Sequence, residues 1–341
     1  MKKLISAALA GALGIAGLAS AALAQQKTLD IVKARGSLTC GVGTGTPGFA
    51  FPDDKGNWSG LDVDYCRAMA AAIFNDPKKV NFKPTTAKER FTALQSGEID
   101  VLSRTTTWTM SRDSAMGLAF TGVTYYDGQG LMVPTKLGVK SAKELNGASV
   151  CVATGTTTEL NLADYFRQNN MTYKPVVFEK VDEVNAAYEA GRCDVYTTDQ
   201  SGLYAQRLRL KNPADHVVLP EIISKEPLGP SVRQGDFQWF TISKWVYFAL
   251  LNAEEAGITS KNVDEMLKST NPDVRRILGV EGEFGKSIGL DNDWVVKIIK
   301  GVGNYGEIYE RNVGPDTPLK IARGVNNLWS KGGLQYAPPI R

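Results

Sequence analysis

The sequence predicts an α/β protein made of two similar lobes, and three observations support this prediction. Segments typical of strands alternate with amphipathic segments typical of helices, which favours helices packed around parallel strands. The same order of segments occurs in both halves of the chain. At 341 residues, the chain is too long for one small core and about the right length for two lobes.

The first 24 residues have the pattern of a cleavable secretory signal peptide. Lys2 and Lys3 precede a run of small and aliphatic residues, and the Ala-Leu-Ala at 22–24 fits the cleavage rule, so we expect Gln25 to begin the mature chain. The alternative is a membrane anchor. The run is rich in alanine and glycine and no stop-transfer charges follow it, which favours cleavage and export.

The next part of the chain carries the pattern of the first lobe. A short helix is expected to end at Gly36, and a longer helix has Asp62 at a position suited to its N-cap. Gly97 is expected to terminate a third helix. The pattern predicts helices at 28–35, 62–75 and 89–96, and strands at 38–43, 80–86 and 99–103.

A second set of segments repeats this order. Gly97 and Gly191 are 94 positions apart, as are Asp100 and Asp194, which indicates a weak internal repeat. Together with the matched order of segments, the repeat favours two lobes of one design. The pattern predicts strands at 148–154, 175–180 and 193–198, and helices at 156–170 and 184–190.

Two segments with glycine or proline at their centres are expected to connect the lobes, one at 124–134 and the other at 226–236. The patterns after the second crossing predict mainly helices, at 236–257, 293–301 and 304–314. The expected organisation is a first part of lobe 1 at 25–126, lobe 2 at 127–228, and a return to lobe 1 with a helical C-terminal extension at 229–341.

The composition argues against several kinds of function. Removing Lys2 and Lys3 lowers the formal charge from +3 to +1, and no run of Lys or Arg remains that would suit a nucleic acid. His216 is the only histidine in the chain. A zinc site, or a nucleophile activated by histidine, is therefore not expected.

The four cysteines are an even number in a chain that we expect to be exported, which favours disulfides. Of the three possible connectivities, we favour Cys40–Cys66 and Cys151–Cys193, because each pair then lies within one predicted lobe and leaves lobe motion free. Four buried free thiols are the alternative.

The segment VLSRTTTWTMSRDS at 101–114 is predicted to form the first lobe's half of a ligand site. Arg112 follows a strand by a short loop rich in hydroxyl groups, and its planar fork suits a carboxylate. Thr105 and Thr107 stand at the carboxyl end of that strand, where open α/β sheets bind ligands. Phe49 and Trp108 are candidates for a wall beside the ligand's side chain, although each is also typical of core packing.

The second lobe offers the other half of this site. Gly155 leads into Thr156 and Thr157 at a helix start, where free N–H groups and the helix dipole favour an anion. Ordinary helix capping is the alternative for these threonines. Asp199, at the end of the strand CDVYTT, could hold an ammonium group. An anion site shared by both lobes with a cation site beside it suits the zwitterionic head of an α-amino acid.

At these residues the sequence resembles the family 3 solute-binding proteins of bacterial ABC amino-acid importers, over essentially the whole mature chain. The motifs that carry the resemblance are GLDVDYCRAMA, SGEIDVLSRTTTWTMSRD, VATGTTTE and YTTDQ. The chain looks most similar to the general L-amino-acid-binding branch, through segments such as DDKGNWSGLDVD and GGLQYAPPIR.

The resemblance implies a two-lobed periplasmic binding protein of type II, with a two-stranded hinge and a ligand cleft between the lobes. It implies a monomer without a cofactor or enzymatic activity, which binds L-amino acids in the periplasm and delivers them to an inner-membrane ABC permease. By motif, Arg112 and Thr157 would bind the α-carboxylate with help from Thr107. Asp199 and the Thr105 backbone would bind the α-ammonium group.

Two further arginines set this chain apart from narrow-specificity members of the family. Arg104 stands where such members usually have a small residue, and Arg90 is expected to face the cleft. We expect them to favour acidic or amide side chains within a broad range of ligands.

Two other classes of function are compatible with this fold. Cyclohexadienyl dehydratases resemble these binding proteins, but their chemistry requires a general acid beside the carboxylate clamp. Glu159 is the nearest candidate, and helix geometry predicts that it points away from the pocket. A ligand-sensing domain would have to signal through another chain, because no transmembrane or kinase segment is attached.

Overall fold

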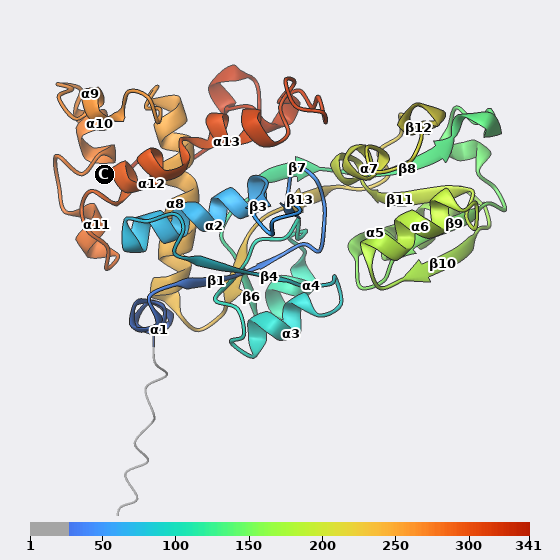
Figure 1. Cartoon of the computed structure of the whole chain (residues 1–341), viewed down its shortest axis with the longest axis horizontal. Coiled ribbons are helices and arrows are strands. Elements are labelled where there is room, and N and C mark those ends of the chain that lie inside the picture. Colours follow the sequence, from blue (N-terminus) through green and yellow to red (C-terminus); the bar gives the residue numbers. More distant parts are fainter. Residues whose placement is uncertain (1–26) are drawn as a thin grey trace, which may run out of the picture.

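A computed structural model describes residues 27–341 of the chain, so the predicted signal peptide at 1–24 lies outside the described residues. The chain forms two α/β lobes that lie side by side along the long axis of the molecule (Figure 1). One lobe holds both ends of the described chain, and the other is made of a single continuous segment between them. No helix in residues 27–341 has the length and apolar character that crossing a bilayer requires.

The sheet of lobe 1 has five strands in the order β4-β1-β5-β14-β6. Its strand β1 is parallel to β4 and β5, whereas β14 is antiparallel to both of its neighbours. The predicted parallel pairing therefore holds for β4, β1 and β5, whereas β14 and β6 pair antiparallel with each other. The bounds are β1 Leu38–Val42, β4 Val80–Pro84, β5 Val101–Leu102, β6 Leu118–Phe120 and β14 Ser231–Arg233, with a small hairpin of β2 Phe51–Pro52 and β3 Trp58–Ser59.

The helices of lobe 1 surround this sheet and a large apolar core. The 19-residue helix α8 buries Trp239, Val246 and Leu250 in that core, against α2 and the C-terminal helices. The helices are α1 Thr28–Arg35, α2 Leu61–Phe74, α3 Arg90–Gln95, α4 Met110–Ser114, α8 Phe237–Glu255, α9 Val263–Met266, α10 Pro272–Ile277, α11 Phe284–Ser287, α12 Trp294–Val302 and α13 Tyr305–Asn312. Short 3₁₀ turns at Gly324–Asn326 and Trp329–Lys331 follow.

Lobe 2 repeats the design of lobe 1 in the order β10-β9-β11-β8-β12. Here β9 is parallel to β10 and β11, and β8 is antiparallel to β11 and β12. The elements are β8 Gln129–Pro134, β9 Ser149–Ala153, α5 Thr157–Gln168, β10 Lys174–Phe178, α6 Val181–Glu189, β11 Val195–Asp199, α7 Gln200–Arg207 and β12 His216–Val218, with 3₁₀ turns at Thr135–Leu137, Ala142–Glu144 and Pro213–Asp215.

The two crossings between the lobes lie side by side. Strand β7 (Tyr125–Asp127) carries the chain into lobe 2, and β13 (Glu226–Leu228) carries it back. They pair antiparallel, with Asp127 opposite Glu226 and Tyr125 opposite Leu228. The strands that follow them, β8 and β14, each enter a sheet in the direction opposite to its parallel strands, which explains why both sheets are mixed.

The four cysteines form two disulfides, each within one lobe, as expected from the sequence. Cys40 on β1 is bonded to Cys66 on α2, with Cα atoms 6.3 Å apart. Cys151 on β9 is bonded to Cys193, with Cα atoms 5.6 Å apart. Each bridge joins a central strand of its sheet to a residue of the same lobe, so neither bridge restrains the angle between the lobes.

The predicted N-cap of α2 is wrong. Gly60 occupies that position, with no side-chain cap, and Asp62 lies inside the first turn. The carboxylate of Asp62 instead accepts hydrogen bonds from Ser103 Oγ at 3.2 Å and Thr105 N at 2.9 Å. The aspartate therefore serves the loop after β5 rather than its own helix.

Candidate ligand-binding site

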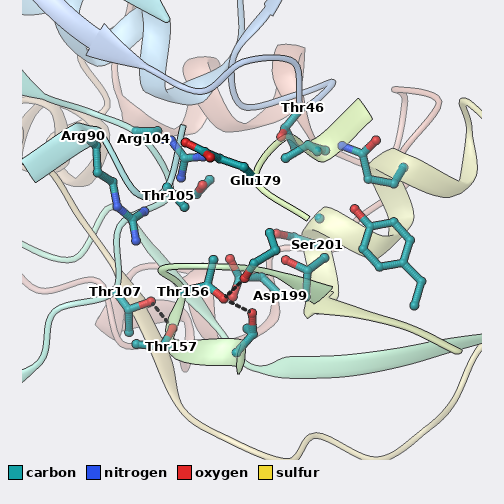
Figure 2. A pocket seen from close by; sticks show the side chains of 18 residues that line it. Thr46, Arg90, Arg104, Thr105, Thr107, Thr156, Thr157, Glu179, Asp199 and Ser201 are labelled. Carbon is teal, nitrogen blue, oxygen red and sulfur yellow. Dashed lines mark hydrogen bonds between the residues drawn. The ribbon is translucent and has the colours of Figure 1, made fainter. Parts of the chain in front are cut away.

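A cavity lies between the two lobes (Figure 2). It is near the β7–β13 pair, because the lining residues Ser201 and Thr107 donate to Asp127 of β7 and Glu226 of β13. The loops after β1 and β5 and the start of α3 line it from lobe 1, and the starts of α5 and α7 line it from lobe 2. The lobes also touch at the edge of the cavity, where Gln206 Nε2 and Arg209 Nη1 donate to Gly45 O at 3.3 and 3.2 Å. The structure is therefore a form in which the lobes are closed on each other.

Most of the residues selected from the sequence line this cavity. From lobe 1 these are Arg90, Arg104, Thr105 and Thr107, and from lobe 2 they are Thr156, Thr157 and Asp199. Thr107 Oγ1 and Thr157 Oγ1 lie 3.2 Å apart, so the two threonine-rich loops meet directly. Polar residues that sequence reasoning missed also line the cavity: Thr46, Thr158, Glu179, Thr198, Ser201 and Gln206.

Phe49 and Trp108 do not line the cavity. Phe49 is buried in the core of lobe 1, where its ring meets Tyr125 edge-on at 5.2 Å. Trp108 stacks on Phe120 at 5.5 Å and is 39% exposed. Both side chains are used for packing, which is the alternative that the sequence left open for each of them.

Thr105 adopts an unusual backbone conformation at the cavity. Its φ is +34°, in the left-handed region that residues other than glycine rarely adopt. The buried carboxylate of Asp62 accepts from its N–H and so fixes this conformation. Burial raises the pKa of Asp62 to about 6, while its hydrogen bonds to Thr105 and Ser103 and the charge of Arg104 oppose that rise.

Three buried arginines surround the lobe 1 side of the cavity. Burial lowers the pKa of Arg104 to about 10, although the carboxylates of Asp62 and Asp199 raise it. Burial also lowers the pKa of Arg90 far below its usual range, and the neighbouring charges of Arg104 and Arg112 add to this effect. The guanidinium groups therefore repel one another in a buried region of low dielectric constant.

Their hydrogen bonds are few and are made mainly to neutral groups. Arg90 donates to Thr106 Oγ1 and Gly155 O, both at 3.4 Å, and within residues 27–341 its Nε has no partner. Arg104 Nε donates to Thr85 O at 3.0 Å. A buried cation without a paired anion is costly, so this side of the cavity is suited to an anionic group.

Arg112 lies just behind the lining of the cavity. Its Nη1 donates to Thr107 O at 2.8 Å, and its guanidinium lies 5.1 Å from the centre of the Phe91 ring. The side chain is 5% exposed, and burial lowers its pKa while the carboxylates of Glu226 and Asp199 raise it. Arg112 thus supports the backbone of Thr107 and adds positive charge to the site.

The start of helix α5 forms the lobe 2 side of the cavity. Thr156 is its N-cap and accepts from Glu159 N at 3.1 Å, so the capping role left open by the sequence is present. Thr157, the first residue of the 12-residue helix, lines the cavity beside it. The carboxylate of Glu159 turns back and accepts from Gly155 N at 3.0 Å, so it caps the chain rather than facing the pocket, as predicted.

Asp199 belongs to a group of three acidic side chains near the hinge. Burial raises its pKa well above the usual range, and the charges of Asp127 and Glu226 raise it further, against Arg90 and Arg112. Asp127 accepts hydrogen bonds from Ser201, at the start of α7, and burial raises its pKa to about 6. A ligand ammonium group beside Asp199 would relieve this repulsion and favour the charged carboxylate.

Glu226 is a member of this site that the sequence did not reveal. It lies in the hinge strand β13, is 0% exposed, and accepts four hydrogen bonds from side chains of both lobes. Two of the donors are Thr107 and Thr157, whose hydroxyl groups were expected to serve the ligand. In the sequence, Glu226 stands in a segment interpreted only as a crossing, and no motif marked it.

Two α/β lobes that enclose a polar, charge-lined cavity near a two-stranded hinge are typical of solute-binding proteins. Nothing in residues 27–341 brings three or more side chains of the metal-binding types together as a candidate metal site. The chain belongs to the bacterial extracellular solute-binding proteins of family 3, whose family model matches residues 38–278. The family predicted from the sequence motifs is thereby confirmed.

Three relatives are similar over nearly their whole length. The general L-amino acid-binding periplasmic protein AapJ of Rhizobium johnstonii is 66% identical, over 99% of each chain. The glutamate/glutamine/aspartate/asparagine-binding protein BztA of Rhodobacter capsulatus is 55% identical, over 97% of this chain and 98% of that protein. A periplasmic binding protein from Brucella ovis, solved with glutathione bound, is 66% identical, with a TM-score of 0.91 over 92% of this chain and 99% of that one.

Proposed function

We propose that this protein is the substrate-binding component of an ABC importer for L-amino acids, with broad specificity. It closes on the zwitterionic head of an amino acid and delivers the ligand to an inner-membrane permease. The observation that carries the proposal is the charge arrangement of the cavity. Buried guanidinium groups and threonine-rich loops from both lobes meet on one side, and Asp199 lies on the lobe 2 side.

The proposed roles follow from the charges. Arg112 and the start of α5 at Thr157 attract the α-carboxylate, with help from Thr107, and Asp199 with the Thr105 backbone holds the α-ammonium group. Thr156 acts as the cap of α5. Closure of the lobes then pairs charges that would be costly to bury alone.

The ligand's side chain is proposed to lie near Arg90 and Arg104. These two guanidinium groups lack a carboxylate partner within the described chain at hydrogen-bond distance, so an acidic or amide side chain would offer what they lack. The relatives AapJ and BztA, which are named for general and for acidic or amide ligands, support broad binding with this preference.

Glutathione is a second candidate ligand. It carries an amino-acid zwitterion at its γ-glutamyl end and another carboxylate at its glycine end, which the extra arginines could bind. The Brucella ovis structure with glutathione bound, at 66% identity, favours this candidate. The two candidates are compatible, because the same clamp would hold the zwitterion in both.

The proposal includes a cellular setting. The chain would be exported by cleavage after residue 24 and act in the periplasm as a monomer, without turning over its ligand. Residues 25–126 and 229–341 would form lobe 1, and 127–228 would form lobe 2. The family is one of solute-binding proteins, and AapJ and BztA are both named as binding proteins, which supports a binding role rather than catalysis.

Calorimetric titration tests the proposal. The protein is unfolded and refolded to remove bound ligand, and is then titrated with all twenty L-amino acids, glutathione, and the dehydratase substrates arogenate and prephenate. We expect micromolar or tighter binding of many amino acids, which corresponds to about −8 kcal/mol or better. Binding of none of them, or turnover of a dehydratase substrate, would contradict the proposal.

Two variants test the clamp in the same assay. Asp199→Asn and Arg112→Gln each remove one charge, and each should weaken binding of every amino acid by roughly a hundredfold or more, because an uncompensated buried charge remains. Asp164→Asn and Arg167→Gln are the matched controls, since both side chains are exposed on α5. Equal affinity of the clamp variants and these controls would refute the assigned roles.

A further inference from the structure

Glu226 is hydrogen-bonded to side chains of both lobes, and the proposed binding of the amino-acid head group does not explain this arrangement. Its Oε2 accepts from Thr107 Oγ1 at 2.5 Å and from Thr157 Oγ1 at 2.8 Å. Its Oε1 accepts from Asn161 Nδ2 and Ser224 Oγ, both at 2.7 Å. We call these five side chains the Glu226 network. A buried carboxylate with four donors is fully satisfied, which makes this arrangement stable in the closed form.

The network joins the two lobes at the hinge. Thr107 is tied to lobe 1 and to β13, because Trp108 N donates to Pro227 O at 2.8 Å and Gly229 N donates to Thr106 O at 3.0 Å. Thr157 and Asn161 lie one turn apart on α5 in lobe 2. Any opening that separates Thr107 from Thr157 must take Glu226 away from at least one of them. Loss of a hydrogen bond to a buried carboxylate is costly, so the network favours closure.

The same two threonines lie beside the helix start that is proposed to bind the α-carboxylate, and Figure 2 shows them meeting at one side of the cavity. Glu226 accepts from both hydroxyl groups and thereby sets their separation of 3.2 Å. Thr157 lies in the first turn of α5, where backbone N–H groups have no partner within the helix. The hydroxyl groups are thus held from behind, and the helix start is left to meet the ligand.

We propose that Glu226 is a positioning residue for amino-acid binding, which joins Thr107 of lobe 1 to Thr157 of lobe 2 and so assembles the carboxylate site as the lobes close. This inference rests on the proposed function for its ligand. Its effect on lobe closure does not depend on which ligand is bound. Because Glu226 acts on the part of the site that all amino acids share, its removal affects all of them by a similar factor.

The opposite role is a defined outcome of the same experiment. A buried carboxylate near a ligand carboxylate could instead repel it, and removal of Glu226 would then tighten binding. Glu226 would in that case be an internal competitor of the ligand rather than a positioning residue.

The test compares Glu226→Ala with Glu226→Gln by calorimetric titration with leucine, glutamate and lysine. The alanine variant should raise all three Kd values about tenfold, because a smaller closed population raises the apparent Kd by the same factor. The glutamine variant keeps an acceptor for the threonines, and its Kd values should stay within about threefold of the parent. Glu221→Gln is the control, because Glu221 lies on the same connecting segment and accepts from Ser141 within lobe 2.

Small-angle X-ray scattering supplies a readout that does not depend on affinity. Without ligand, Glu226→Ala should be at least as open as the parent protein, and at saturating ligand the two should have the same radius of gyration. An alanine variant that folds and binds all three amino acids with unchanged or lower Kd would overturn the proposal. So would a change in only one ligand's Kd, which would indicate a side-chain contact.

The proposal can still be tested if the alanine variant does not fold or if the parent protein binds no amino acid. If Glu226→Ala fails to fold, Asn161→Leu removes one donor of the network without changing a residue that lines the cavity, and it should raise all three Kd values together. Unchanged Kd values in this variant would overturn the proposal. If the parent protein binds no amino acid, the proposed function fails. The scattering comparison then still judges the Glu226 network, since a more compact Glu226→Ala protein would refute it.

Discussion

Replacing Asp62 by asparagine should change how the stability of the ligand-free protein depends on pH. Asp62 is 5% exposed, and its carboxylate has hydrogen bonds from Ser103 and Thr105. Burial outweighs these bonds and raises its pKa from 3.8 to about 6. The folded protein therefore binds a proton at this carboxyl group more tightly than the unfolded chain does.

The size and the direction of the effect follow from this shift. A rise of roughly two pKa units corresponds to about 3 kcal/mol between the two protonation states. Since the folded pKa is raised, this contribution to stability is fully present below the unfolded value of 3.8 and is lost as the pH rises through about 6. Of the total, about 1 kcal/mol is lost between pH 5 and pH 7. Asparagine does not titrate, so the variant should not show this loss.

Denaturant unfolding of the ligand-stripped protein, followed by tryptophan fluorescence from pH 4 to pH 8, measures the effect. The difference in unfolding free energy between Asp62→Asn and the parent should shift in favour of the variant by about 1 kcal/mol from pH 5 to pH 7. Asp54→Asn, in the exposed loop between β2 and β3, controls for the loss of one negative charge. A difference that stays flat over this range, or that shifts the other way, would refute the assignment of a raised pKa to Asp62.

Three other changes should give distinct results. Gly229→Ala places a Cβ 1.9 Å from Gly122 O, so we expect a loss of more than about 3 kcal/mol in unfolding free energy; a stable variant with normal binding would contradict this. Removal of the Cys151–Cys193 bridge by serine replacement should lower the unfolding free energy by about 4 kcal/mol for a sequence separation of 42. Hydrogen exchange should then increase in lobe 2, and equal increases in both lobes would show that the bridge does not stabilise lobe 2 alone. Arg104→Gln should weaken glutamate about tenfold relative to leucine in titrations, and equal changes for both ligands would argue against a contact with the side chain.

The sequence predicted well those features that repeat or that follow directly from local pattern. The helices and strands that were predicted in both lobes occur in the expected order, and the disulfides pair as expected. The short elements α4, β6, α7 and β12 were not predicted. The residues Thr105, Thr107, Thr157 and Asp199 were found because strand ends and helix starts of α/β sheets converge on one edge. Such convergence is a property of the topology. A correct prediction of the topology therefore also predicts that these residues lie close together.

Features that depend on tertiary packing were not accessible from local pattern. Phe49 and Trp108 stand next to site residues in the sequence, but their rings pack on Tyr125 and Phe120, which the local pattern does not indicate. Glu226 is 119 positions from Thr107, and only the pairing of the two crossings brings them together.

The antiparallel member of each sheet was missed for a similar reason. Strand β14 joins the first sheet after the chain has passed through lobe 2, so its partners are distant in sequence. Hydrophobic alternation can indicate that a strand exists, but the direction of its pairing depends on the path of the connection.

The position of β14 also has a consequence for the order in which the protein can fold. Lobe 2 is one continuous segment, so all of its strands are available once β12 has been synthesised. The sheet of lobe 1 cannot be completed at that stage, because β14 lies between β5 and β6 and comes later in the chain. Until residues 231–233 arrive, β5 and β6 each have an unpaired edge, and such edges are prone to pair with other chains. Lobe 2 can therefore complete its sheet first, and the lobe that is begun earliest is the last to be finished.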